Sequence, residues 1–215
     1  MSQHLYLFSP SGAIDEGVLE RAVANLTTLG YKVTVDRFAG ARHLRFAGTD
    51  AQRAGAFARA AASKAEVCMV TRGGYGLTRY LPQLDFAALA ASGKKWLGFS
   101  DFTAFQMAML PHKSAKLLAG PSALTFAGVE GADFAASDLD EVMLGSFQET
   151  LDGVTEAVGW DAKVAGVGSP ACSVRGRLWG GNLTIACRAS CTQSLNCRPT
   201  GAHARCRRVS PPQLP

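Results

Sequence analysis

Short apolar runs alternate with segments of helical spacing through about the first 110 residues, and this alternation limits the fold more than any other feature. Strands and helices in this order favour a mostly parallel sheet with helices on both faces and right-handed connections. A chain of 215 residues can bury a sizeable core around such a sheet. The expected strands are 5–8, 31–38, 66–71 and the run before Ser100, and the expected helices are 15–29, 49–63, 85–91 and 101–110.

Ser100 lies where an apolar strand passes through a tight turn into a helix, in the sequence Gly98-Phe99-Ser100-Asp101-Phe102. Such a turn displays a serine hydroxyl clear of the sheet, and the free N–H groups of the first helical turn point toward an oxyanion formed beside it. The simpler interpretation is that Ser100 caps the helix. The full G-x-S-x-G pattern is missing, because Phe102 stands where that pattern has glycine.

A glycine-rich loop, Arg72-Gly73-Gly74-Tyr75-Gly76, follows the strand at 66–71. Glycines allow positive φ and close approach of a ligand, so their N–H groups can form an anion-binding concavity. An ordinary loop is the alternative, and the phosphate-binding motifs G-x-G-x-x-G and G-x-x-x-x-G-K-[ST] are absent. Because sites in parallel sheets lie beyond the carboxyl ends of strands, we expect this loop and Ser100 to share one rim.

The order and spacing of several motifs resemble the LD-carboxypeptidases, a family of serine peptidases. The motifs are R-G-G-Y-G at 72–76, L-P-Q-L-D at 81–85, G-F-S-D-F-T at 98–103, and shorter matches at 8–12, 45–49, 120–121 and 178–183. The resemblance covers about residues 3–186. It implies a flavodoxin-like N-terminal α/β domain at 1–150, a linker at 151–172 and the start of a smaller C-terminal domain at 173–186.

The resemblance also implies an activity, the removal of a terminal D-alanine from murein tetrapeptides during peptidoglycan recycling. Ser100 would be the nucleophile, and the backbone N–H groups of Gly74 and Asp101 would hold the oxyanion. Arg72, Gly73 and Tyr75 would bind the peptide. No metal or other cofactor is implied, and the family suggests a homodimer.

The sequence departs from the family where the general base is expected. The resemblance places a Glu and a His of the catalytic triad in the C-terminal domain, but no acidic residue follows Asp161 and the only later histidine is His203. His112 follows Ser100 by twelve residues, beyond the expected helix, which is too far for direct proton transfer. His4 and His43 read as solvated side chains. We therefore expect this chain to be inactive or nearly so, with a non-catalytic muropeptide-binding module as the alternative.

Residues 187–215 differ in composition from the rest of the chain. They hold five arginines and four of the six cysteines but no lysine, aspartate or glutamate, so the net charge of +5 lies entirely there. A zinc site lacks paired C-x₂-C spacing, an RNA-binding arm lacks aromatic residues for stacking, and disulfides do not suit a reducing compartment. We expect a disordered tail produced by a frameshift near codons 185–188.

The remaining features indicate a cytoplasmic protein that binds neither nucleic acid nor membrane. The N-terminus has no basic segment followed by a long apolar core, and no apolar run is long enough to span a bilayer.

Overall fold

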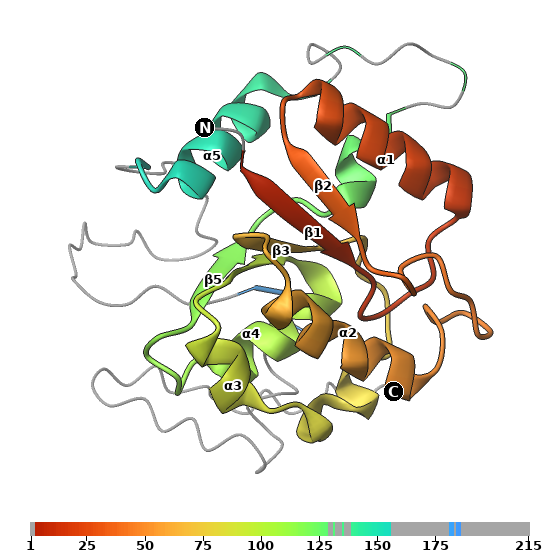
Figure 1. The fold of residues 1–215 in the computed structure, drawn as a ribbon, viewed down its shortest axis with the longest axis vertical. Coiled ribbons are helices and arrows are strands. Elements are labelled where there is room, and N and C mark those ends of the chain that lie inside the picture. The colour runs from red at the N-terminus through yellow and green to blue at the C-terminus, as the bar shows by residue number, and fades with distance from the viewer. Residues whose placement is uncertain are drawn as a thin grey trace, which may run out of the picture.

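The structure, a computed structural model, describes residues 3–128, 131, 135, 139–155, 181, 182, 184 and 185. Its centre is a sheet of five strands in the order β2-β1-β3-β4-β5, and every neighbouring pair is parallel (Figure 1). This order is the flavodoxin-like one, which confirms the expected fold class. The strands are β1 (His4–Phe8), β2 (Lys32–Val35), β3 (Val67–Val70), β4 (Lys95–Gly98) and β5 (Lys116–Ala119).

The helices begin at residues whose side chains satisfy free backbone N–H groups. Asp15 accepts from the N–H of Gly17, Asp85 accepts from that of Ala88, and Thr49 forms a capping box with Gln52. These caps bear out three of the helix starts expected from sequence. The helices are α1 (Glu16–Thr28), α2 (Asp50–Ala62), α3 (Phe86–Ala91), α4 (Thr103–Met109) and α5 (Glu141–Asp152).

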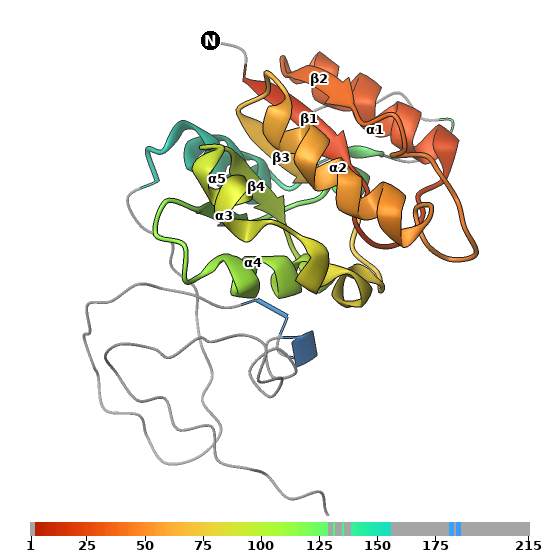
Figure 2. The same ribbon diagram turned by 60° about the horizontal axis from the view of Figure 1, so that its bottom comes forward.

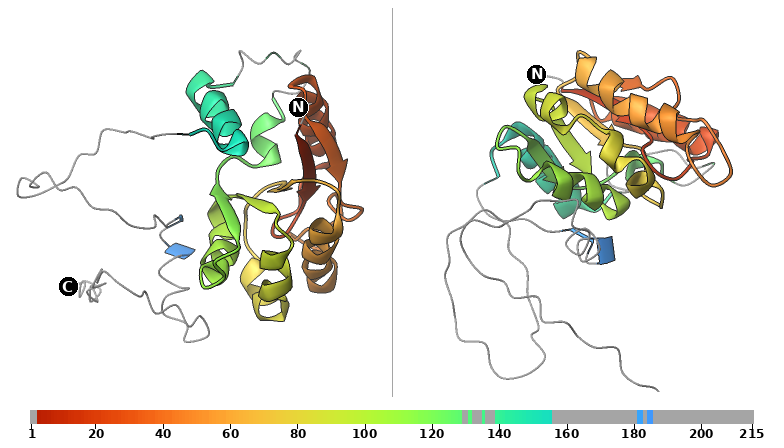
Figure 3. Two further views of the ribbon diagram at one scale, coloured as in Figure 1. Left: turned by 60° about the vertical axis from the view of Figure 1, so that its left-hand side comes forward. Right: turned by 90° about the horizontal axis from the view of Figure 1, so that it is seen from below.

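Both faces of the sheet are covered, because side chains alternate along each strand. Tyr6 and Phe8 of β1 pack against α2, α3 and α4, while Leu5 and Leu7 pack against α1 and α5. Figures 2 and 3 show these helices as separate layers on the two sides of the sheet. The expectation of helices on both faces is thus confirmed.

Two expected elements differ in detail from the structure. The expected helix at 101–110 is a 3₁₀ turn (Ser100–Phe102) followed by α4, and the expected strand at 31–38 is shortened to β2. β2 ends at Val35, and the Asp36 N–H makes one further bond to the Leu7 carbonyl of β1 at 2.8 Å.

The domain division falls largely outside the described residues. α5 ends at Asp152, and Gly153 follows with φ of +75°, close to the expected start of the linker. Most of 151–172 and 173–186, and all of the tail at 187–215, lie beyond what the structure describes. Among the described helices, none is both long and apolar enough to cross a membrane.

Candidate active site at the carboxyl ends of the strands

Ser100 follows β4 with a left-handed backbone conformation, φ of +61°. Few residues other than glycine adopt this region, so the turn holds the serine in a strained geometry. A Cβ added at Gly98, just before the turn, would lie 2.7 Å from Val70 Cγ2 and 2.8 Å from Phe102 Cδ1, so only glycine fits there. The strand can therefore turn sharply directly above the core.

Ser100 does not cap the helix that follows. The N-cap position of α4 is Phe102, and neither α4 nor the 3₁₀ turn before it has a side-chain cap. The capping interpretation is therefore wrong. Within the described part of the chain the Ser100 hydroxyl forms no hydrogen bond, and its side chain is only partly buried. The hydroxyl is therefore accessible, but a nucleophilic serine also needs a hydrogen bond to a general base, which none of the described residues supplies.

The glycine-rich loop is pressed between Ser100 and the loop after β1. A Cβ at Gly73 would lie 2.8 Å from the Ser100 Cβ and 3.0 Å from its Oγ. Gly74 has φ of +121°, and a Cβ there would lie 3.2 Å from the backbone of Gly12. The Gly12 N–H donates to the Gly73 carbonyl at 3.3 Å. The loop can lie this close to Ser100 only because Gly73 has no Cβ.

Asp101, in the turn after β4, binds both the loop after β1 and the end of the glycine-rich loop through its buried carboxylate. Its Oδ2 accepts from the Ser11 hydroxyl at 2.7 Å and from the Leu77 N–H at 3.1 Å. The side chain is almost completely buried, and its Oδ1 has no partner among the described residues. The Asp101 backbone nitrogen lies 3.7 Å from where a Cβ of Gly73 would be. The two stretches expected to supply oxyanion donors, Gly73–Gly74 and Ser100–Asp101, are therefore adjacent.

Arg72 and Tyr75 leave the same loop in different directions. The Arg72 guanidinium is partly buried and donates to the Ala13 carbonyl at 3.1 Å, so it ties the glycine-rich loop to the loop after β1. Tyr75 is half exposed, and its ring centre lies 6.3 Å from that of Phe46 and 5.1 Å from the Arg45 guanidinium. Tyr75 is the more exposed of the two side chains.

Arg53, which sequence analysis did not single out, connects the loop after β1 to the glycine-rich loop. It is fully buried, and its Nη1 donates to the carbonyls of Pro10 at 3.3 Å and Gly76 at 3.1 Å. Its guanidinium lies 4.8 Å from the Phe46 ring centre and 4.9 Å from that of Tyr80. The signal was present in the sequence, because position 53 lies three and four residues before the apolar Ala56 and Phe57 on α2.

The described histidines offer Ser100 no hydrogen bond. His4 lies at the opposite end of the sheet, where its Nε2 is 2.8 Å from Thr34 Oγ1. Burial lowers its pKa, and Lys32 and Lys94 lower it further against the opposing effect of Glu66. His112 stacks on Phe86, with ring centres 6.4 Å apart. No group of His, Cys, Asp and Glu side chains suited to a metal ion occurs among the described residues.

Comparison with known proteins gives consistent matches. Residues 5–120 match the family model described as the LD-carboxypeptidase N-terminal domain. A murein tetrapeptide carboxypeptidase of Pseudomonas aeruginosa is 31% identical over 201 residues, which are 91% of this chain and 63% of that protein. The crystal structure of a muramoyltetrapeptide carboxypeptidase from Oxalobacter formigenes is 36% identical, with a TM-score of 0.71 over 88% of this chain and 60% of that one.

A more distant match concerns the fold alone. The microcin C7 self-immunity protein in complex with aspartyl sulfamoyl adenosine is 24% identical, with a TM-score of 0.60 over 70% of this chain and 44% of that one. This chain spans 63% of the Pseudomonas aeruginosa protein and 60% of the Oxalobacter formigenes protein, about three fifths of each.

Proposed function

The chain belongs to the LD-carboxypeptidase family, and on that premise we propose that it carries the nucleophile of a serine-type carboxypeptidase acting on murein tetrapeptides. The observation that supports this most is the backbone of Ser100, left-handed and in contact with Gly73. The turn lies at the carboxyl end of β4, where parallel sheets place their sites. Ser100 is then the catalytic nucleophile.

The proposed reaction begins with attack by Ser100 Oγ on the amide carbonyl that joins meso-diaminopimelate or lysine to the terminal D-alanine. The backbone N–H groups of Gly74 and Asp101 stabilise the negative charge on the carbonyl oxygen. The amide C–N bond breaks, D-alanine leaves with a proton on its amine, and an acyl-enzyme remains for water to hydrolyse. Arg72, Gly73 and Tyr75 seat the peptide.

This reaction needs a general base, since a serine hydroxyl is a weak nucleophile near neutral pH. Family resemblance assigns this function to a histidine oriented by a glutamate in the C-terminal domain. In the printed sequence the last acidic residue is Asp161 and the only later histidine is His203, neither of which the structure describes. We therefore propose that the 215-residue chain turns over tetrapeptide very slowly, if at all.

Release of D-alanine from purified murein tetrapeptide tests both parts of the proposal. We expect little release by the full chain near neutral pH, and slow labelling of Ser100 by a serine-directed fluorophosphonate at about pH 10, where hydroxide can take the proton that the missing general base would accept. Mass spectrometry locates the label. Ser100→Ala should remove the label, whereas Ser63→Ala, which changes a serine at the end of α2, should retain it. Labelling elsewhere would refute Ser100 as nucleophile, and rapid release lost in Ser100→Ala would refute the proposed inactivity.

A muropeptide-binding module without catalysis is the second candidate. It is favoured by the absence of a histidine hydrogen bond to Ser100 among the described residues. Calorimetric titration with tetrapeptide that shows saturable binding without D-alanine release, together with no fluorophosphonate labelling, would support it over the enzyme. For either candidate we propose a cytoplasmic protein of peptidoglycan recycling, with the homodimer expected only of the full-length family.

A further inference from the structure

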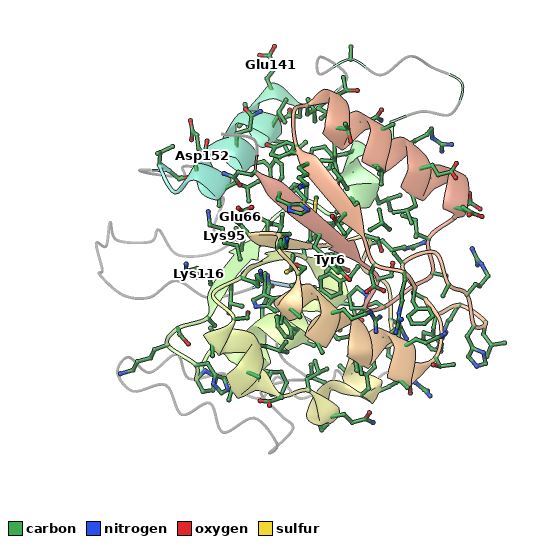
Figure 4. The ribbon with its side chains drawn as sticks, viewed as in Figure 1. Tyr6, Glu66, Lys95, Lys116, Glu141 and Asp152 are labelled. Atoms are coloured by element: carbon green, nitrogen blue, oxygen red, sulfur yellow. The ribbon has the colours of Figure 1, made fainter. Side chains whose placement is uncertain are left out.

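A hollow of about 460 Å³ lies at the amino ends of β3, β4 and β5, the opposite end of the sheet from Ser100. Figure 4 shows Glu66, Lys95, Lys116 and Asp152 gathered there beside the end of α5. Its volume is within the range of about 300–1,000 Å³ that is usual for small-molecule sites. Four lysines and two acidic residues contribute to its lining: Lys64, Lys94, Lys95, Lys116, Glu66 and Asp152.

None of the four lysines forms an ion pair with an acidic side chain in the described part of the chain. Lys94 donates to the carbonyls of Ser63 at 2.6 Å and Ala65 at 2.7 Å, and so binds the end of α2. Lys95 donates to the Leu151 carbonyl at the end of α5. Carbonyl groups satisfy donors without carrying a full charge, so among the described residues only Glu66 and Asp152 offset the four ammonium charges in the hollow.

Lys64 and Lys116 are exposed, and their ammonium groups have no hydrogen bond within the described residues, so these groups are available to a ligand in the hollow. Lys116 pairs in register with Lys95 on the neighbouring strand, so the two side chains leave the same face of the sheet. Like charges held side by side repel. An anion between them would remove that repulsion.

The two carboxylates are held at the side of the hollow next to β1. Glu66 accepts from the His4 N–H at 3.0 Å, and this bond, with one from its own backbone, lowers the pKa of Glu66. Asp152 accepts from the Gln3 amide. With four lysines against these two acids, the hollow carries a formal charge of +2.

We propose that this hollow binds a small, multiply charged anion bearing phosphate groups. Its cations are all lysines, and an ammonium is a compact charge that suits tetrahedral phosphate from several directions. No described arginine lines the hollow, so an anion there would be held by point charges without the two-pronged geometry of a guanidinium, and citrate in the test below distinguishes carboxylate from phosphate. The site is independent of Ser100 and of the proposed peptidase reaction.

Calorimetric titration of the full chain with sodium pyrophosphate at low ionic strength tests the proposal. We expect one saturable site, weakened about tenfold in Lys116→Gln and in Lys64→Gln, since each removes a charge-assisted hydrogen bond. Lys32→Gln is the matched control, because Lys32 is also the exposed first residue of an edge strand but does not line the hollow. Affinity should be unchanged in that variant.

Three outcomes would overturn the proposal: no saturable binding, equal weakening by all three substitutions, or binding of citrate as tight as that of pyrophosphate. ADP is titrated in parallel. Weakening of ADP binding by the same two substitutions supports the site, and the tighter of the two ligands shows whether a nucleotide or a free phosphate compound is its source. Thermal denaturation confirms that each variant is folded.

Discussion

At the scale of single residues, Ser100 adopts a backbone conformation that costs the fold some stability. A left-handed conformation costs a residue with a Cβ about 1–2 kcal/mol. The packing of Phe102 below the turn and of Gly73 beside it offsets this conformational free energy. The serine is consequently presented at a position where glycine would be more stable.

Ser100→Gly should therefore stabilise the protein while removing the hydroxyl. Glycine adopts positive φ freely, so we expect its free energy of unfolding to exceed that of Ser100→Ala by about 1 kcal/mol. Urea denaturation of the two variants, both lacking the hydroxyl, isolates the backbone effect. Equal stability of the two variants would mean that the turn is not strained.

The sequence was sufficient to place Ser100 and the glycine-rich loop at one rim, because both follow strands of a parallel sheet. The side-chain role of Asp101 was missed, and only its backbone was considered. Its carboxylate binds Ser11 and Leu77, which are 90 and 24 residues away along the chain. No local pattern reports such a contact, whereas a strand-to-helix turn is visible within a few residues.

At the scale of elements, Asp36 fastens the end of β2 to β1 and α2. Its carboxylate accepts from the Tyr6 hydroxyl at 2.7 Å and from two nitrogens of Arg59 at 2.7 and 3.0 Å. Burial alone would raise the pKa of Asp36, but the hydrogen bonds from Arg59, Tyr6 and the Phe38 N–H outweigh it and lower the pKa. The ionised form therefore stabilises the fold.

The stability lost in Asp36→Asn should depend on pH. Because the pKa of Asp36 is lower in the folded protein than in the unfolded one, its contribution is full above the ordinary pKa of about 4 and is lost as pH falls through the folded value. We expect a loss of about 3 kcal/mol between pH 5 and 7 that shrinks below about pH 4. Denaturation midpoints across this range measure it.

Glu20→Gln is the control for this experiment, since it removes the same charge from an exposed position on α1. Its effect on the free energy of unfolding should be small at every pH. A loss in Asp36→Asn that stays constant down to pH 2.5 would contradict the assigned pKa shift.

The sequence predicted α1, α2 and α3 within two residues, α1 from the helical spacing of its apolar residues and α2 from its capping box. It left β5 and α5 unassigned. β5 is a four-residue edge strand whose two leucines are only partly buried, so its pattern is weak. α5 carries its own signals, Asp140 as the N-cap and Gly153 after the end, which were overlooked.

At the scale of the whole molecule, one sheet separates two hydrophobic cores. Phe57 belongs to the core under α2, α3 and α4, and Phe126 to the core under α1 and α5. The strands contribute alternate side chains to both. Loss of packing on either side should therefore loosen the same sheet.

Phe57→Leu and Phe126→Leu should each lower the free energy of unfolding by about 1–3 kcal/mol and preserve a single transition. Far-UV and near-UV circular dichroism, followed through the same urea titration, should give coincident curves. Val142→Ala, at a side chain 77% exposed on α5, should change little. Separate transitions in either phenylalanine variant would show that the two cores unfold independently.

Arg53 couples the local opening of two loops. Because one guanidinium binds the carbonyls of both Pro10 and Gly76, the loop after β1 and the glycine-rich loop cannot open separately without leaving a buried cation partly unbonded. The amide protons of the two loops should then exchange with solvent in one concerted fluctuation, at a free energy set by α2. The surroundings of Ser100 would thus switch as a unit between closed and open, rather than fray loop by loop.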